Sequence, residues 1–196
     1  MYIPCDIARQ ILDNAYISNP GLWREHSKTV AHAARTIAEY VEGMEPEKAY
    51  SFGLLHDIGR IKGFSHMRHV IDGYRYLSDM GYEENARICI THSFPLKNIN
   101  SYSGNNDCSP DDFMEISSLL REYEYDDYDR LIQLCDAVAL PGKICILEQR
   151  LVDVAIRNGI NEYSIQKWQS FLRLKDYFDQ KTGTDLYTLL GVFSTQ

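Results

Sequence analysis

The stretch LLHDIGRIKG, residues 54–63, places an imidazole and a carboxylate directly after two leucines. His56 continues the apolar face of the residues before it, and Asp57 stands beside it at the end of that segment. Gly59 indicates that a helix ends here. An unpaired carboxylate among apolar groups is costly unless a cation or hydrogen bonds meet it. The stretch therefore predicts a helix that delivers a His and an Asp to one charged, buried site.

Outward from this stretch, apolar residues recur mostly three and four positions apart between breaks formed by glycine and proline. This period is typical of helices, and we expect an all-α fold. RICITHSF, residues 87–94, has β-branched residues that suit a strand, but it continues a helical pattern and we predict helix. The expected helices cover residues 4–17, 21–43, 46–57, 66–80, 83–92, 110–122, 126–140, 143–158, 162–180 and 184–190.

The composition favours one compact domain covering residues 1–196. No apolar run approaches the roughly 20 residues that cross a bilayer, and the first residues do not resemble a signal peptide, so we expect a cytoplasmic protein with no membrane partner. The net charge of −8, from 20 basic and 28 acidic side chains, opposes binding to a nucleic acid polymer. A small anion can still bind if metal ions reverse the field locally. The sequence indicates no oligomeric state.

The cysteines do not indicate a disulfide framework or a thiolate metal site. They are odd in number and contain no CxxC pair, and we expect reduced thiols. They are Cys5, Cys89, Cys108, Cys135 and Cys145.

The helical spacing sorts the histidines by face. His26 begins the apolar stripe of the helix expected at 21–43 and is predicted to point inward. His32 lies about 120° farther around that helix, and we expect it to be structural or solvated. His66 and His69 share one face with apolar residues, so spacing alone leaves both open as inward ligands.

Two further polar residues lie on largely apolar helices. His92 stands near the end of its helix, directly before the irregular segment SFPLKNINSYSGNNDCSP at residues 93–110. A long loop of this kind is either a binding loop or lid, or a mobile insertion. Asp136 lies among Ile132, Cys135 and Ala139, and a solvated edge or a cap interaction would be the default for an isolated carboxylate there.

These residues together resemble the HD-domain superfamily of metal-dependent phosphohydrolases, in its HDIG-type, six-ligand dinuclear variant. The ordered set spans residues 26–136, and LLHDIG is its most specific element. The matching segments are EHSKTVA at His26, LLHDIG at His56 and Asp57, HVIDG at His69, ITHS at His92 and LCDAV at Asp136.

The resemblance implies a helical bundle with a metal-binding core at about 21–140 and a C-terminal helical extension at about 141–196. The extension is expected to serve for packing or as a cap on the substrate side. Gly73, four residues after His69, matches the family pattern and favours His69 over His66. By this resemblance one metal ion would be held by His26, His56, Asp57 and Asp136, and a second by His69 and His92, with Asp57 bridging.

The implied chemistry is attack on phosphorus by a metal-activated hydroxide. Asp57 would serve both ions. Arg60 and Lys62 could neutralise a phosphate oxygen. The alternative for these two residues is that they are solvated cations on a surface turn. Nitrogen-rich ligands suit Fe or Mn first, with Zn, Ni or Co also compatible, as one or two divalent ions. The chain lacks the GYP of cyclic-dinucleotide phosphodiesterases and the downstream acidic signature of alarmone hydrolases, which opposes both substrates.

We therefore expect a phosphohydrolase acting on a small phosphorylated metabolite, with nucleotides among the candidates. Two alternatives remain at this stage. Some members of the superfamily with this ligand set are di-iron oxygenases of small alcohol-type substrates. The second alternative is a metal-stabilised binding module without turnover.

Overall fold

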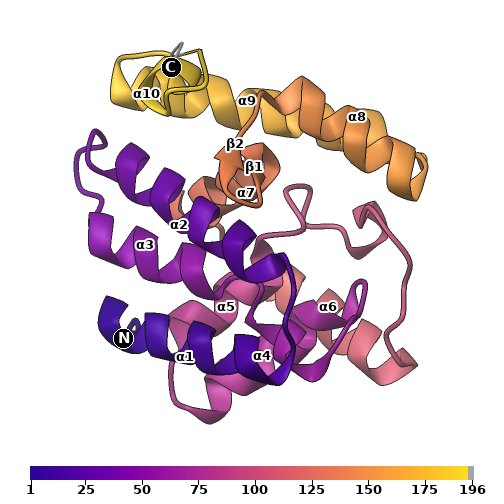
Figure 1. Ribbon diagram of the computed structural model, residues 1–196. Coiled ribbons are helices and arrows are strands. Elements are labelled where there is room, and N and C mark those ends of the chain that lie inside the picture. The colour runs from indigo at the N-terminus through magenta and orange to yellow at the C-terminus, as the bar shows by residue number, and fades with distance from the viewer. Residues whose placement is uncertain (194–196) are drawn as a thin grey trace.

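The computed structural model describes residues 1–193, and helices dominate it (Figure 1), which confirms the all-α prediction. Among the described residues, no helix is long and apolar enough to cross a membrane. The α-helices are α1 (Cys5–Ser18), α2 (Trp23–Ala38), α3 (Pro46–Leu55), α4 (Arg68–Asp79), α5 (Glu83–Thr91), α6 (Pro110–Glu122), α7 (Asp127–Val138), α8 (Leu147–Asn158), α9 (Ser164–Thr182) and α10 (Leu186–Leu189). Short elements are the 3₁₀-helices η1 (Ile58–Lys62) and η2 (Ile99–Ser101) and the strands β1 (Ala139–Leu140) and β2 (Lys143–Ile144).

The helix predicted at 21–43 is shorter in the structure, where α2 ends at Ala38. The chain then turns through Gly43, whose φ of +81° is left-handed and suits glycine. Val41 is buried in this turn with an exposed fraction of 5%. The apolar spacing therefore continued past the real end of the helix, because the turn itself packs on the core.

A small hairpin separates the helices predicted at 126–140 and 143–158. β1 and β2 pair antiparallel, with Ala139 opposite Ile144, around a turn that contains Gly142 at φ +77°. The Cys145 N–H donates to the Val138 carbonyl at 2.8 Å and closes the base of the hairpin. Strands of two residues are too short to show a period of two in the sequence.

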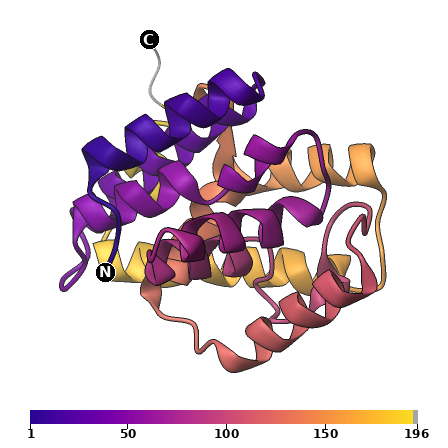
Figure 2. The same cartoon turned by 90° about the horizontal axis from the view of Figure 1, so that it is seen from below.

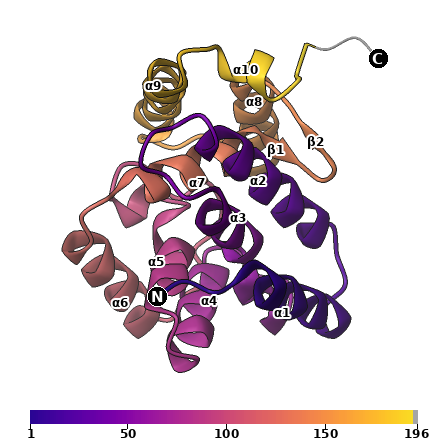
Figure 3. The same ribbon diagram turned by 90° about the vertical axis from the view of Figure 1, so that its left-hand side faces the viewer.

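The C-terminal helices share the main apolar core. Phe171 and Phe178 of α9 and Leu186 of α10 are buried in one cluster with Val30 of α2 and Leu131 of α7. Figure 3 shows α8, α9 and α10 gathered above α2 and α7. This packing favours the prediction of one domain, since the extension buries its apolar faces against the predicted metal-binding core.

A close backbone contact fixes the turn after α3. A Cβ atom added to Gly59 would lie 1.9 Å from the His69 carbonyl oxygen and 2.6 Å from the Gly73 nitrogen. Only glycine permits this approach, so η1 packs directly on α4. The contact brings the residues of the opening stretch beside His69.

The long segment after α5 lies against the C-terminal helices. Figure 2, the view from below, shows the segment approaching the turn between α8 and α9. The Asn161 side-chain amide in that turn donates to the Tyr102 carbonyl at 3.4 Å. The extension therefore contacts the loop that follows His92.

Candidate metal centre

The first group of potential metal donors joins three helices. His26 of α2, His56 at the end of α3 and Asp57 offer ligand atoms that all lie within 4.8 Å of one another. Asp136 of α7 joins this group, because its Oδ1 lies 2.9 Å from His26 Nε2 and 3.8 Å from His56 Nε2. The predicted His26, His56, Asp57 and Asp136 are therefore brought together at one place.

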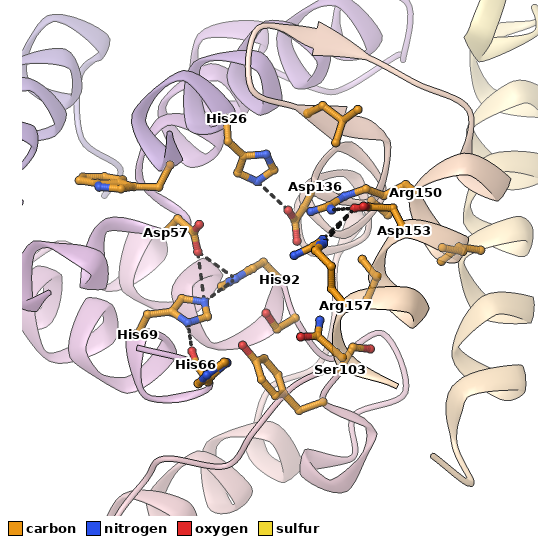
Figure 4. A pocket seen from close by; sticks show the side chains of 18 of the residues that line it. His26, Asp57, His66, His69, His92, Ser103, Asp136, Arg150, Asp153 and Arg157 are labelled. Atoms are coloured by element: carbon orange, nitrogen blue, oxygen red, sulfur yellow. Dashed lines mark hydrogen bonds and ion pairs between the residues drawn. The ribbon is translucent and has the colours of Figure 1, made fainter. Parts of the chain in front are cut away.

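The second group shares Asp57 with the first. Asp57, His69 of α4 and His92 after α5 also offer ligand atoms within 4.8 Å of one another. Asp57 Oδ1 lies 3.1 Å from His69 Nε2 and 3.7 Å from His92 Nε2. Figure 4 shows His26, Asp57, His69, His92 and Asp136 around one cavity, with Asp57 between His26 and the pair His69 and His92.

Backbone carbonyls orient three of these imidazoles. His56 Nδ1 donates to the Gly53 carbonyl at 2.8 Å, and His92 Nδ1 donates to the Ile88 carbonyl at 3.1 Å. His69 Nδ1 likewise donates to the His66 carbonyl. A proton on Nδ1 leaves the lone pair on Nε2, the nitrogen that faces the group in each case. All three rings are thus fixed in the tautomer of a metal ligand.

The unsatisfied nitrogens provide a test of whether a cation fits. His56 Nε2 is buried without a hydrogen-bond partner among the described residues. His69 Nε2 and His92 Nε2 lie only 3.4 Å apart, although their Nδ1 atoms hold the ring protons. Buried lone pairs that face one another in this way are unfavourable without a positive ion. The donor set fits a divalent transition metal of the nitrogen-preferring kind.

The pKa values favour the protonation states that metal ligands need. Burial lowers the pKa of His92 to about 3, and the neighbouring His56 and His69 act in the same direction. Burial also lowers the pKa of His56. Burial alone would raise the pKa of the Asp57 carboxyl, but the Arg60 guanidinium holds it well below its usual range. Neutral imidazoles and an ionised carboxylate are the forms that bind a metal.

The two predicted cations have different positions. Arg60 lines the cavity, but its Nε donates to Asp57 Oδ2 at 2.7 Å and its Nη1 to the Ser65 carbonyl at 3.3 Å. Its charge is therefore compensated by Asp57. Lys62 is exposed at the end of η1 and does not line the cavity. The structure brings Arg60 into the site as a partner of Asp57 and leaves Lys62 outside it.

The structure separates His66 from His69, which the spacing left open. His69 belongs to the Asp57 group, whereas His66 is half-buried at the cavity wall and holds His69 through its backbone carbonyl. His32 is exposed and packs edge-on against the Tyr50 ring, as expected for a residue outside the buried face of α2.

His26, Asp57, His69, His92 and Asp136 line a cavity of about 600 Å³. The wall across from Asp57 and His69 comes from the C-terminal extension, which contributes Arg150, Asp153 and Arg157 of α8 (Figure 4). Lys167 of α9 also lines the cavity. The loop after His92 adds Tyr102. The extension therefore forms a cap over the site as well as packing on the core.

Sequence reasoning offered a cap as one of two roles for the extension but did not identify the residues that form it. Arg150, Arg157 and Lys167 look like ordinary polar positions of amphipathic helices, and no spacing rule relates them to residues a hundred positions earlier. One available signal was the tryptophans: both in the chain, Trp23 and Trp168, line the cavity.

Comparison with known proteins identifies the family. A family model described as the HD domain matches residues 23–140. The chain therefore belongs to the HD-domain family, a superfamily of metal-dependent phosphohydrolases. The match ends at Leu140, so the cap lies outside it. Searches found no match among curated proteins and none among solved structures.

Proposed function

We propose that the protein hydrolyses a phosphomonoester or phosphoanhydride of a small metabolite, with nucleotides among the candidate substrates. One observation carries this proposal: two groups of buried donors share Asp57 at the wall of a cavity whose opposite wall is cationic. Such a cavity suits an anion that reaches the donors with one end. Residues 1–196 would act as one domain, with the metal-binding core at about 21–140 and the extension as the substrate-side cap.

The proposed ligands are His26, His56, Asp57, His69, His92 and Asp136. A bound divalent ion lowers the pKa of a coordinated water and polarises phosphoryl oxygens. The chain supplies the orientation: backbone carbonyls fix three imidazoles, and Arg60 holds Asp57 Oδ2 while Oδ1 faces His69 and His92. We therefore assign Arg60 to positioning Asp57. Lys62 is not part of the proposed site, because it does not line the cavity.

The nature of the donors favours Fe or Mn, with Zn, Ni and Co compatible, because imidazole-rich sites bind these ions in preference to Mg or Ca. The sharing of Asp57 supports two ions, whereas the first group alone would hold one. Elemental analysis of protein purified without chelator would give the identity and number of ions per chain.

The proposal is tested with His56→Ala and Asp57→Ala. Each variant should lose bound metal and should release phosphate from a panel of phosphate esters at no more than about a thousandth of the wild-type rate, since removing a metal ligand removes the activated water. His32→Ala is the matched control, because His32 is an exposed histidine outside both donor groups.

The assay is run without oxygen to separate hydrolysis from the oxygenase alternative. Anaerobic phosphate release by the metal-loaded wild type supports hydrolysis. Turnover that requires oxygen, accompanied by a mixed-valent iron signal, would contradict it. Full activity in a metal-free His56→Ala protein would contradict the role of the metal.

A further inference from the structure

The cavity reverses the charge balance of the chain. The whole sequence has 20 basic and 28 acidic side chains, yet the cavity is lined by four cations (Arg60, Arg150, Arg157 and Lys167) and three carboxylates (Asp57, Asp136 and Asp153). Two of those carboxylates belong to the proposed metal ligands, and bound divalent ions would make the cavity still more positive. A single reacting phosphate facing the ions would leave the cations of the cap without an anionic partner.

The α8 part of the cap holds two arginines on one carboxylate oxygen. Asp153 Oδ2 accepts from Arg150 Nη1 at 3.0 Å, from Arg157 Nε at 3.2 Å and from Arg157 Nη2 at 2.9 Å. The spacing of three and four residues places all three side chains on one face of α8, and Figure 4 shows them across the cavity from Asp57 and His69. One carboxylate compensates one of the two guanidinium charges. The pair therefore retains a positive charge and free N–H donors at the cavity wall.

Lys167 adds a second uncompensated cation. Its side chain is 7% exposed, and its Nζ donates to the Ser93 carbonyl at 3.1 Å, the Ser101 carbonyl at 3.2 Å and the Ser103 hydroxyl at 3.2 Å. No carboxylate within the described residues forms an ion pair with it. Its hydrogen bonds are satisfied, but no carboxylate contacts its charge directly, and Asp136 attracts it only from a longer distance. A buried charge without a paired counterion is costly. An anion in the cavity would supply that counterion.

Aromatic side chains also line the cavity. Trp23, Tyr102 and Trp168 line the same cavity as the donors and the cap. A volume of about 600 Å³ is in the range of sites for small organic molecules and is much larger than a phosphate ion needs. The cavity thus combines the metal donors, the cations of the extension and aromatic surface around a space large enough for an organic molecule.

From this arrangement we propose that the substrate carries a second anionic group, bound by Arg150 and Arg157 of the cap within the positive field of Lys167. The inference rests on the proposed function, because it assumes that the reacting phosphate faces the metal donors. The substrate class is a small organic metabolite that bears two phosphates, or a phosphate and another oxyanion, at separate positions.

The test compares matched monophosphates and bisphosphates, using fructose monophosphate against fructose bisphosphate and adenosine monophosphate against adenosine bisphosphate. Both tryptophans line the cavity, so their fluorescence after rapid mixing with the metal-loaded protein reports binding before turnover. The bisphosphate of at least one pair should bind about tenfold more tightly, the value of one additional charged hydrogen-bonded contact. Equal affinities within both pairs would overturn the inference.

Variants of the α8 residues test whether the cap causes the preference for the bisphosphate. The combined replacement Arg150→Met, Asp153→Asn and Arg157→Met should reduce the preference to about twofold or less. Arg121→Met is the matched control, since it also removes one net positive charge but lies on the exposed face of α6 outside the cavity, and it should retain the preference. An unchanged preference in the combined variant would overturn the inference.

Asp153→Asn alone provides a test that does not depend on the combined variant folding. It removes the carboxylate that occupies both arginines, so the preference for the bisphosphate should rise; a fall would contradict the inference. Phosphate release is measured on the same samples without oxygen. A bisphosphate preference without any phosphate release would refute the proposed function and leave the second anion site supported. Phosphate release without a preference for the bisphosphate would support the proposed function and refute the second anion site.

Discussion

The contact between Gly59 and His69 shows how one residue positions the site. Gly59 allows η1 to lie on the backbone of α4, and this contact sets Asp57 and His69 beside each other. Any side chain at this position would have to displace backbone atoms, which cannot move as a flexible side chain can.

Gly59→Ala should therefore destabilise the protein by about 3 kcal/mol or more, at the upper end of overpacking effects. Urea unfolding of the chelator-treated protein measures the change. Gly43→Asn is the control, because Gly43 has a left-handed φ with no atom near its absent Cβ, and asparagine tolerates this conformation. The control should cost less than about 1 kcal/mol. Equal stability of the two variants would contradict this account of the turn.

The charge of Lys167 gives a pH prediction. Burial lowers the pKa of Lys167 to about 8, from its ordinary value of 10.5. Between these two values the unfolded chain binds a proton at this position and the folded protein does not, so stability should rise with pH. Relative to Lys167→Met, the wild type should gain about 1 kcal/mol per pH unit from pH 8 to 10. Parallel pH profiles of the two proteins would show that Lys167 keeps its ordinary pKa.

At the scale of elements, a buried ion pair holds together the helices that carry His92 and Asp136. Asp129 of α7 is fully buried and accepts from Arg87 Nε at 3.1 Å and Thr91 Oγ1 at 2.7 Å, both on α5. Asp129 also completes the capping box of α7 by accepting from the Asp126 N–H at 2.8 Å. Asp129 thus joins α5 to α7, together with the buried hydrogen bond that the Gln133 side-chain amide donates to the Thr91 carbonyl at 2.9 Å.

Arg87→Met should destabilise the protein by about 3 to 5 kcal/mol, because it leaves the Asp129 charge buried without its cation. Adding Asp129→Asn to this variant should recover part of the loss, since it removes the stranded charge. The free energy of unfolding, measured in urea on chelator-treated protein, checks both values. A double variant less stable than Arg87→Met would contradict the assignment.

The sequence predicted the elements well where local rules decide them. The helix at 110–122 has the predicted ends, because Pro110 follows Ser109, whose hydroxyl caps the first turn. The ordered His and Asp motifs also indicated which residues meet around Asp57. The hairpin at 139–144 was not predictable from period, and the placement of Arg150 and Lys167 depends on the packing of α8 and α9 over α7. These features arise only from tertiary structure.

At the scale of the whole molecule, the proposed ligands come from both ends of the metal-binding core, so metal binding should stabilise the entire fold. Saturation at a thousand times the dissociation constant adds about 4 kcal/mol to the free energy of unfolding. Chelation should lower the melting temperature of the wild type and leave that of His56→Ala nearly unchanged. Calorimetry with and without metal measures both. A wild type indifferent to chelation would contradict the metal centre.

The distribution of the donors along the chain also sets an order for their appearance during synthesis. A ribosome completes Asp57, His69 and His92 well before it reaches Asp136, while His26 must wait for that carboxylate to approach across α7. A nascent chain released before α7 would expose histidines that lack their acidic partner. Loading of the proposed first metal site would therefore come late in the synthesis of each molecule, after most of the polypeptide has been made.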